Sequence, residues 1–391
     1  MKRKILIIAS WYPSPASPVG GIFVQDQAMT LSRQYEVAVL APQLRNWREL
    51  RKTRPSIASN VGERRDGLAV YRPQVPAPLP RPRSLAYLFY LPTVRRSFAK
   101  LMSEWGKPDL IHAHVVLPGG WVAAKLGLRH SLPVVLTEHS SPFAMHLHRA
   151  YQRQLVRQAL AHVQQIIAVS PSLAKEIRDF FPAAPIVVAG NLIKTDFFTP
   201  KENDEARSAG ATTRFLSIAL LTRQKGINDL LQAARLLLRR GCTSFELIIG
   251  GDGPERPALE RLAQDLGLVS RCRFLGLLAP AQVRQWMQEC DAFVMPSLHE
   301  SFCIVLGEAM ACGKPVIATR CGGPEYVVTP ETGTLVEPAS PEALAATLES
   351  YISWRVKFDA RTVRESVVKR FGEQVFLRNL SAIYEQVWSN F

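Results

Sequence analysis

The 391-residue chain lacks the features that mark membrane, secreted or repeat proteins. No segment approaches the roughly 20 consecutive apolar residues that a membrane-spanning helix needs. Neither a low-complexity tract nor a short-period repeat is present, which argues against a solenoid. The cysteines form no C-x-x-C pair, and all six lie in the second half, at Cys242, Cys272, Cys290, Cys303, Cys312 and Cys321. Without a secretory context they predict reduced thiols in a cytoplasmic protein.

Length and composition describe a soluble globular protein with two domains. The hydrophobic content is 47% and the charged content 21%, and a chain of this length predicts two domains of roughly 190 residues each. The basic N-terminus precedes a short apolar run, Ile5–Ala9, that stops at Tyr12 and Pro13. This run is too short for a signal peptide, so it is interpreted as a buried first strand.

The net charge of +15 is confined to the first half of the chain. Residues 1–200 hold 26 Lys and Arg against 11 Asp and Glu, whereas residues 201–391 hold 22 of each kind. One interpretation is an ordinary solvated surface. The other is a surface that meets an anionic membrane or an acidic acceptor, because each basic residue near an anionic leaflet contributes about 1 kcal/mol. Nucleic acid is not an expected partner, since the charge is not combined with stacking aromatics in a known module.

Short apolar runs alternate with amphipathic stretches, the pattern of strands that feed helices in a parallel sheet. In the first half, strands are predicted at Ile5–Ala9, Val37–Leu40, Leu68–Tyr71, Leu110–His112, Val134–Thr137, Ile166–Val169 and Ile186–Ala189. In the second half, they are predicted at Phe215–Leu220, Glu246–Ile249, Arg273–Phe274, Ala292–Met295, Pro315–Ala318 and Thr334–Val336. Helices are predicted at Phe23–Arg33, Pro171–Phe180, Ile227–Arg239, Arg256–Leu266, Ala281–Glu289, Ile304–Cys312, Pro341–Tyr351 and Glu373–Trp388.

A polar stretch, Thr199–Thr213, separates the two sets of elements and is interpreted as a linker region. The fold class predicted is α/β, with two Rossmann-like, doubly wound domains facing across a cleft at the carboxyl ends of their strands. The N-terminal domain is expected over residues 1–198, the C-terminal domain over 199–370, and a terminal helix over 371–391.

The segment between Arg72 and Trp105 is basic and rich in aromatic residues. Five prolines and three arginines in Arg72–Arg83 precede the apolar run Leu85–Leu91, and further basic residues follow. An amphipathic stretch of this composition is able to lie in a membrane interface. A core helix with a solvated basic face fits equally well, and the sequence leaves both interpretations open.

The strongest chemical signal is the stretch Pro296–Val316, which leads from a strand end into a helix closed by Gly313 and on into another strand. A helix N-terminus near Phe302–Ile304 offers unpaired backbone N–H groups and a partial positive charge, which suits a diphosphate. Glu308, one and a half turns into the helix, is placed to accept hydrogen bonds from a ribose, and Glu300 to meet the sugar. Taken alone, two such glutamates would favour the interpretation as surface charges.

This stretch resembles the signature of retaining family-4 glycosyltransferases with the GT-B fold, in which seven residues separate two glutamates. The resemblance spans most of the chain in the family's order. In the second half it rests on Lys225-Gly226, Gly250–Pro254, Phe274-Leu275-Gly276 and Gly322–Glu325. In the first half it rests on Gly20-Gly21, Ile111–His114, Thr137-Glu138-His139, and Asn191 with Asp196–Phe198.

The resemblance implies transfer of a sugar from a nucleotide-diphosphate donor without a metal. It implies that Glu300 lies by the donor sugar, that Glu308 binds the ribose and that Lys225 binds the phosphates. His139 is implied to face the reacting carbon, where it polarises or hydrogen-bonds the sugar. The expected catalytic residues are His139, Glu300 and Lys225. The expected donor-binding residues are Gly20, Gly21, Arg223, Lys225, Gly251, Gly253, Leu275, Glu300, Phe302, Cys303, Ile304 and Glu308.

The chemistry of the leaving group supports these assignments. A departing nucleoside diphosphate carries concentrated negative charge, so a site without a metal must supply cations and N–H dipoles. Lys225 and the N–H groups of Phe302–Ile304 are the candidates. No D-x-D pair stands where it would hold a divalent ion, and no cofactor is expected. The remaining histidines considered show no metal-ligand spacing with carboxylates and are interpreted as structural: His112, His114, His146 and His148.

Two positions depart from the family pattern. Family members often carry an arginine five residues before the phosphate lysine, where this chain has Leu220. Either Arg223 serves the diphosphate, or Lys225 and the helix dipole act without it, and Leu220 is expected to end the strand in the core. Cys303 stands where glycine is usual, which predicts a slightly altered backbone approach to the donor.

The expected function is retaining transfer of a hexose from a UDP- or GDP-sugar to a saccharide or lipid-linked saccharide acceptor, in bacterial surface-polysaccharide biosynthesis. The N-terminal domain is expected to bind the acceptor, and the last helix to pack back on that domain, as in this fold. Peripheral contact with the anionic inner face of the cytoplasmic membrane is expected. The alternative is a sugar-nucleotide epimerase or phosphorylase of the same architecture, but neither a pyridoxal lysine nor an acid–base group poised on the sugar is visible.

Overall fold

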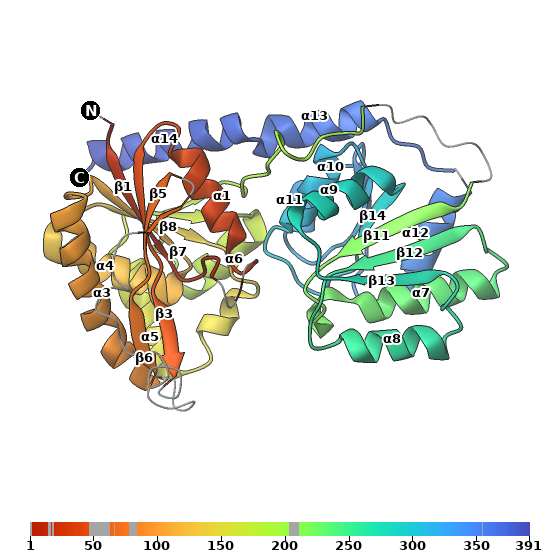
Figure 1. Ribbon diagram of the computed structural model, residues 1–391, viewed down its shortest axis with the longest axis horizontal. Coiled ribbons are helices and arrows are strands. Elements are labelled where there is room, and N and C mark those ends of the chain that lie inside the picture. The colour runs from red at the N-terminus through yellow and green to blue at the C-terminus, as the bar shows by residue number, and fades with distance from the viewer. Residues whose placement is uncertain are drawn as a thin grey trace. The chain divides into compact units, whose positions relative to one another are not determined.

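The computed structural model describes residues 2–14, 17, 19–46, 63–65, 67–77, 84–202, 211–353 and 355–391. The chain divides into two compact units (Figure 1). Unit 1 comprises Met1–Val169, Leu173–Ala189 and Leu377–Phe391, and unit 2 comprises Ser170–Ser172 and Gly190–Phe376. Part of the predicted linker, residues 203–210, and the end of the proline-rich segment, residues 78–83, lie outside the described residues.

Unit 1 is built on a sheet that has eight strands in the described part of the chain, in the order β10-β9-β8-β7-β1-β2-β5-β4. All neighbours are parallel except β4 and β5. A separate parallel pair joins β3 to β6. The strands are β1 (Lys4–Ala9), β2 (Glu36–Leu40), β3 (Gln43–Asn46), β4 (Glu63–Arg65), β5 (Leu68–Tyr71), β6 (Gln74–Ala77), β7 (Leu110–His114), β8 (Val134–Glu138), β9 (Gln165–Ala168) and β10 (Ile186–Val188).

Helices connect the parallel strands of unit 1, as crossover connections require. They are α1 (Ile22–Leu31), α3 (Ser84–Glu104), α4 (Trp121–His130), α5 (Ala150–Leu160) and α6 (Pro171–Phe180). The central strand β1 is buried from Ile5 to Ala9, because helices cover the sheet and the strand sequence is continuously apolar. The interpretation of this run as a buried first strand is confirmed.

Unit 2 is built on a wholly parallel six-stranded sheet in the order β13-β12-β11-β14-β15-β16, counted over the described residues. The strands are β11 (Thr213–Ile218), β12 (Phe245–Gly250), β13 (Cys272–Gly276), β14 (Ala292–Met295), β15 (Val316–Thr319) and β16 (Gly333–Val336). The helices are α7 (Ile227–Arg239), α8 (Arg256–Asp265), α9 (Pro280–Glu289), α10 (Ile304–Ala311), α11 (Pro324–Val327), α12 (Pro341–Ile352) and α13 (Ala360–Phe371).

Both faces of the second sheet are covered. Leu230, Leu259 and Leu344, from α7, α8 and α12, belong to one apolar cluster with residues of the strands. Helices α9 and α10 lie on the opposite face (Figure 1). The strand order is that of a doubly wound sheet, which reverses between β11 and β14. The helices that follow these two strands, α7 and α10, therefore lie on opposite faces of the sheet.

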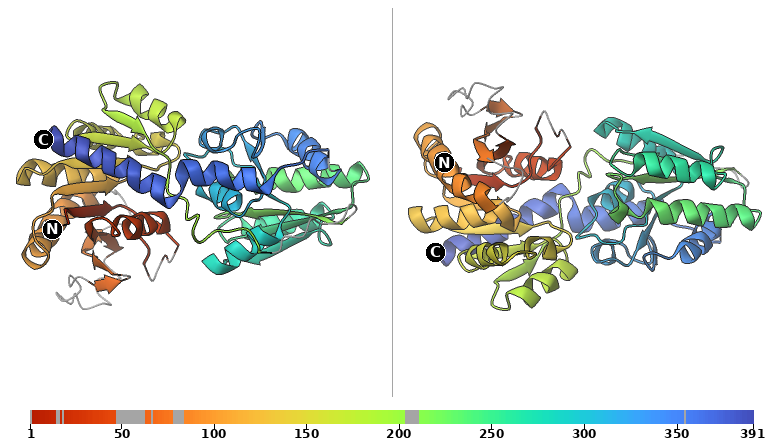
Figure 2. Two further views of the ribbon diagram at one scale, coloured as in Figure 1. Left: turned by 90° about the horizontal axis from the view of Figure 1, so that it is seen from above. Right: turned by 90° about the horizontal axis from the view of Figure 1, so that it is seen from below.

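The last helix, α14 (Glu373–Ser389), continues from unit 2 into unit 1. Within unit 1, the hydroxyl of Tyr384 lies 2.6 Å from Nδ1 of His112, and Nε1 of Trp388 donates to the carbonyl oxygen of Asp109. The guanidinium of Arg3 lies 4.0 Å from the Trp388 ring. In both views of Figure 2 this blue helix runs along unit 1. The amphipathic pattern of the segment is thus explained by a buried face on the first sheet.

Helix α3, which contains most of the basic aromatic segment, has one buried face and one exposed face. Tyr90, Val94 and Phe98 are buried, so one face belongs to the core. Leu88 is 67% exposed and Phe89 41% exposed near the start of the helix. Within the described ranges, no helix combines the length and the apolar character that crossing a bilayer requires.

The expectation that Leu220 ends a core strand is wrong. Strand β11 ends at Ile218, and Leu220 is 64% exposed. The chain turns here, because the N–H of Thr222 donates to the carbonyl of Leu220 at 2.8 Å. Leu221, one residue later, is the side chain that enters the core.

Candidate active site

Lys225 and Glu300 meet where the strand order of unit 2 reverses. Lys225 ends the short helical turn Arg223–Lys225 after β11, and Glu300 lies in the loop after β14. Nζ of Lys225 donates to Oε1 of Glu300 at 2.7 Å, and Oγ of Ser297 donates to the same oxygen at 2.8 Å. Glu300 is only 8% exposed. The site therefore holds a partly buried ion pair at the carboxyl edge of the sheet.

The electrostatics keep Lys225 charged. Burial by itself lowers the pKa of Lys225, but the charge of Glu300 and its hydrogen bond outweigh burial, so the pKa stands above the ordinary value of 10.5. Its partner Glu300 stands three residues before Cys303, the N-cap of α10, so the ammonium lies near the start of that helix. At neutral pH the site presents a fixed cation.

A glycine brings the two loops together. Gly226 has φ +66°, and a Cβ placed on it would lie 1.9 Å from the carbonyl oxygen of Pro296. The N–H of Leu298 donates to the carbonyl of Gln224 at 2.8 Å, which fastens the loops beside the ion pair. Only a residue without a side chain allows this approach.

Helix α10 begins where the sequence predicts. Its first residue is Ile304, its N-cap is Cys303, and no side chain caps its first N–H groups. Cys303 has φ 72° and ψ 73°, which lies in the left-handed region that favours glycine. This backbone conformation is a physical reason why glycine is usual at this position in the family. Gly313, with φ +77°, follows the C-cap and ends the helix as predicted. Glu308 is half-buried one turn into α10.

The backbone of Glu300 is held from the neighbouring loop. Its N–H donates to Cys321 at 3.1 Å, and its carbonyl accepts from Gly323 at 2.7 Å. A Cβ on Gly323 would lie 2.3 Å from the backbone nitrogen of Phe302. The side chain of Phe302 is fully buried. These contacts fix the path of the chain between Glu300 and α10.

The glycine turn after β12 packs against the loop that carries Lys225. A Cβ on Gly251, which has φ +107°, would lie 1.9 Å from the carbonyl oxygen of Ala219, and one on Gly253 would lie 2.5 Å from that of Leu221. The N–H of Gly251 donates to Gly276 at the end of β13, beside the half-buried Leu275. Among the predicted site residues, Gly251, Gly253 and Leu275 thus lie at the same edge as Lys225. Arg223 lies two residues before Lys225 with an exposed side chain.

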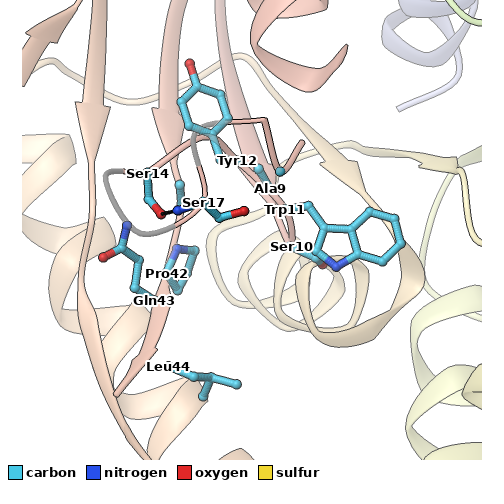
Figure 3. A pocket seen from close by; sticks show the side chains of 11 residues that line it. Ala9, Ser10, Trp11, Tyr12, Ser14, Ser17, Pro42, Gln43 and Leu44 are labelled. Carbon is cyan, nitrogen blue, oxygen red and sulfur yellow. Dashed lines mark hydrogen bonds between the residues drawn. The ribbon is translucent and has the colours of Figure 1, made fainter. Parts of the chain in front are cut away.

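Unit 1 carries a pocket of about 260 Å³ at the carboxyl edge of β1 and β2 (Figure 3). Ser14, Ser17 and Gln43 lie on one side and the indole of Trp11 on the other (Figure 3). Of the predicted glycines, Gly20 contributes to the lining. Gly21 is the N-cap of α1 with φ 74°, and a Cβ there would lie 2.4 Å from the backbone of Trp11. This glycine shapes the pocket by allowing the chain to fold closely on Trp11.

His139 lies at the end of β8 and is part of a histidine cluster that the sequence did not reveal. Its Nε2 lies 3.0 Å from Nδ1 of His114, the last residue of β7, and the rings stack at 5.3 Å with an interplanar angle of 15°. Phe23 lies 4.7 Å from the His139 ring. The sequence signal for this cluster is a histidine at the end of each of two predicted strands. In the structure these strands are neighbours, and their register pairs His114 with Thr137, two residues before His139.

Burial keeps the other histidines of the cluster neutral. It lowers the pKa of His112 to about 3 and that of His114 well below its ordinary value, the latter with help from His112 and His139. Glu138 holds the backbone beside them, since it accepts from the N–H groups of Val116, His139 and Ser140 at 2.7–2.8 Å. Across the part of the chain that the structure describes, no group of three or more His, Cys, Asp or Glu is arranged to hold a metal.

Comparison with known proteins gives the family. The model described as Glycosyltransferase Family 4 matches residues 20–197, and the model described as Glycosyl transferases group 1 matches residues 199–366. A Bacillus subtilis protein named as a teichuronic acid biosynthesis glycosyltransferase, TuaC, is 30% identical over 360 residues, which cover 89% of each chain. A D-inositol 3-phosphate glycosyltransferase of Streptosporangium roseum is 28% identical over 74% of this chain and 72% of its own.

Solved structures share the fold. Sucrose-phosphate synthase from Thermosynechococcus elongatus aligns over the whole of both chains with a TM-score of 0.81 and 23% identity. Anabaena HepE, solved in complex with UDP and glucose, aligns over 98% of this chain and 100% of its own with a TM-score of 0.74 and 20% identity. Two parallel-sheet α/β domains of this kind define the GT-B architecture, and the predicted fold class is confirmed. The chain belongs to the group 1 glycosyltransferases.

Proposed function

We propose that the protein is a metal-independent, retaining glycosyltransferase that takes a hexose from a UDP- or GDP-sugar. The observation that carries the proposal is the ion pair of Lys225 and Glu300 beside the uncapped start of α10. The chain itself supplies a cation and a set of backbone N–H groups at one place. Both kinds of group stabilise a leaving diphosphate.

The proposed mechanism places the diphosphate beside Lys225 and the first turn of α10. The bond between the anomeric carbon and the diphosphate oxygen breaks while the hydroxyl oxygen of the acceptor approaches from the same face. The hydroxyl proton passes to the departing phosphate oxygen, which balances the transfer. Glu308 accepts hydrogen bonds from the ribose, and Glu300 lies by the hexose and holds Lys225 in place. No carboxylate is nominated as a covalent nucleophile, so an ion-pair-like, front-side path is proposed.

The acceptor is proposed to bind in the pocket of unit 1. Hydroxyls of Ser14 and Ser17, the amide of Gln43 and the ring of Trp11 are groups suited to a saccharide. Relatives named for teichuronic acid biosynthesis and for inositol phosphate support a hydroxyl-rich acceptor. A saccharide or lipid-linked saccharide in bacterial surface-polysaccharide biosynthesis is the proposed acceptor class.

Contact with the cytoplasmic face of an anionic membrane is proposed for the exposed face of α3. Leu88 and Phe89 give an apolar contact near the helix start, and Arg96 is exposed two turns later. Apolar side chains next to basic residues favour an anionic interface. The excess positive charge of residues 1–200 also favours contact of this part of the chain with an anionic membrane.

The experiment that tests the function has two stages. UDP- and GDP-sugars are first screened for their effect on the melting temperature, since a ligand that binds only the native state raises it. The sugar that binds is then incubated with saccharide acceptors in the presence of EDTA, and the anomeric configuration of the product is read by NMR. Retention of configuration and undiminished turnover in EDTA are expected. Inversion would refute the retaining assignment, and loss of turnover in EDTA would refute metal independence.

The same experiment separates transfer from the alternative chemistry. An epimerase converts a sugar nucleotide without a second substrate, whereas a transferase needs an acceptor. Family membership favours transfer over the epimerase or phosphorylase reaction. Incubation of the sugar nucleotide alone is therefore expected to leave its stereochemistry unchanged.

A further inference from the structure

A short segment packs against helix α10 where the chain enters the main part of unit 2. It covers residues 190–198, and we call it the support segment. The support segment contains the matches to the family pattern at Asn191 and Asp196–Phe198, to which the proposed mechanism assigns no role. Its residue Ile193 has no exposed surface. The segment is therefore part of the packed interior of unit 2.

The first contact of the support segment is with a glycine inside α10. Glycine in the interior of a helix is less favourable than alanine, because it loses more backbone freedom on folding. Gly307 is nevertheless buried in the middle of α10. A Cβ on it would lie 2.6 Å from Cδ1 and 2.8 Å from Cγ1 of Ile193. Ile193 therefore packs directly on the backbone of α10, one residue before Glu308.

The second contact is with the residue before the N-cap of α10. A Cβ on Gly190 would lie 2.5 Å from Cε1 of Phe371 and 2.8 Å from Cε2 of Phe302. These two phenyl rings are buried and pack edge to face, with centroids 5.1 Å apart and an interplanar angle of 89°. Because Phe302 directly precedes Cys303, the N-cap, this packing locates the start of the helix.

Hydrogen bonds from α13 and α14 hold the support segment against α10. The guanidinium of Arg364 donates to the carbonyl oxygens of Thr195 at 3.0 Å and Phe198 at 2.9 Å. It also donates to the carbonyl of Ala311, the last residue of α10. The carboxylate of Glu373 accepts from the hydroxyl of Thr195 at 2.6 Å. One arginine therefore fastens both the support segment and the end of the helix on which that segment packs.

We propose that Gly190 and Ile193 are positioning residues that set where α10 lies. Gly190 acts through Phe302 on the N–H groups at the start of the helix, which are proposed to bind the diphosphate. Ile193 acts through Gly307 on the neighbouring Glu308, the proposed ribose ligand. The effect on donor binding rests on the proposed function, whereas the support of α10 itself does not.

The support of α10 is tested on the full chain without ligand. Gly307→Ala brings a Cβ against Ile193, so amide hydrogen exchange in residues 300–311 is expected to become roughly threefold faster. Helix propensity alone predicts slower exchange, because alanine favours a helix more than glycine does. Adding Ile193→Ala removes both close atoms and should return exchange most of the way to the wild-type rate. Slower or unchanged exchange in Gly307→Ala, or a double variant as fast as Gly307→Ala, would overturn the proposal.

Binding of UDP and GDP tests the consequence for the donor. With the nucleotide that binds, Gly307→Ala is expected to weaken binding about tenfold in isothermal titration, because small misplacement of binding groups is costly. The double variant with Ile193→Ala should recover most of the loss. Gly127→Ala is the matched control, since Gly127 is buried inside α4 and a Cβ there would lie 2.4 Å from Cγ2 of Val134. It should lower the melting temperature and leave nucleotide affinity unchanged.

Three outcomes separate the positioning role from its alternatives. Equal loss of nucleotide affinity in Gly127→Ala and Gly307→Ala would show a general effect of lower stability and would contradict the proposal. If Gly307→Ala does not fold, Gly190→Ala decides, because it is expected to raise exchange in residues 300–311 through Phe302, and a wild-type rate would overturn the proposal. If neither UDP nor GDP binds the wild-type protein, the proposed function fails, and the exchange rates still decide whether the support segment positions α10.

Discussion

Nζ of Lys225 and Oε1 of Glu300 are 2.7 Å apart although the two residues are 75 positions apart in the sequence. The two residues meet because β11 and β14 are neighbouring parallel strands, so the loops that follow them start at the same edge of the sheet. Ser297 shares the same carboxylate oxygen. The cation proposed to bind diphosphate is therefore held in place before any ligand arrives.

Replacing Lys225 with methionine removes the cation. The nearly buried carboxylate of Glu300 then has no positively charged partner. We expect kcat to fall by at least tenfold and the free energy of unfolding to fall by about 2 kcal/mol, since the pair is only partly dehydrated. Steady-state kinetics and urea unfolding measure the two effects. Lys175→Met, which breaks the exposed pair with Asp179, is the matched control and is expected to change stability little. Equal effects of both variants would contradict the account.

The contribution of Lys225 to stability has a defined pH dependence. Because its pKa is raised in the folded state, its stabilising effect is complete below the ordinary lysine value of 10.5 and is lost as pH rises through the folded-state pKa. The difference in unfolding free energy between wild type and Lys225→Met should be constant from about pH 7 to 9. It should then shrink above pH 10.5. A difference that grows with pH would show that the lysine is not stabilised in its charged form.

Glu308→Ala tests the proposed contact with the ribose. Loss of hydrogen bonds to a carboxylate is expected to weaken donor binding by roughly 10- to 100-fold while kcat changes little. Isothermal titration with the nucleoside diphosphate and steady-state kinetics provide the measurement. Glu342→Ala, an exposed carboxylate of α12, serves as the control. Unchanged donor affinity in Glu308→Ala would refute the assignment.

Gly226→Ala tests whether close contact of two loops builds the site. The added Cβ would lie 1.9 Å from the carbonyl oxygen of Pro296, so the loops must separate and the Lys225–Glu300 distance must grow. We expect weaker diphosphate binding and a lower melting temperature. Gly241→Ala is a sharp control, because Gly241 also has a positive φ, +80°, but a Cβ there meets nothing within 4 Å. Similar diphosphate affinity in both variants would mean that the contact does not support the site.

The membrane proposal predicts a dependence on lipid charge. Wild-type protein should co-sediment with anionic vesicles and not with neutral ones. Leu88→Glu combined with Phe89→Glu should abolish most of that binding, because the apolar contact is replaced by charge of the wrong sign. Val269→Glu, at a 68% exposed apolar position of unit 2, is the control. Equal sedimentation with both kinds of vesicle would contradict the proposal.

Periodicity predicted the architecture well where side chains alternate between core and solvent. The runs Leu68–Tyr71 and Ala292–Met295 are strands with the predicted limits, and Ile227–Arg239 is a helix with the predicted limits. Gly313 marked the end of α10, because the left-handed residue after a helix favours glycine. The short pair β3 and β6 was not predicted, since strands of four residues with mixed polarity carry little pattern.

The contacts within the site could not be obtained from spacing. Sequence reasoning assigned Lys225 to phosphate and Glu300 to sugar, but their ion pair depends on strand order, which no local pattern encodes. For the same reason His114 was interpreted as structural, although the sheet brings it against His139. The prediction for Leu220 is wrong because an apolar residue after a strand gives the same sequence pattern whether the strand continues or the chain turns.

The central claim is that a pyrophosphate binds between Lys225 and the start of α10. The most direct measurement is a crystal structure of the protein with the nucleoside diphosphate that raises its melting temperature. The account predicts phosphate oxygens within hydrogen-bond distance of Nζ of Lys225 and of the N–H groups of Cys303 or Ile304, with the ribose at Glu308. A diphosphate bound away from the segment between Glu300 and Glu308 would contradict it.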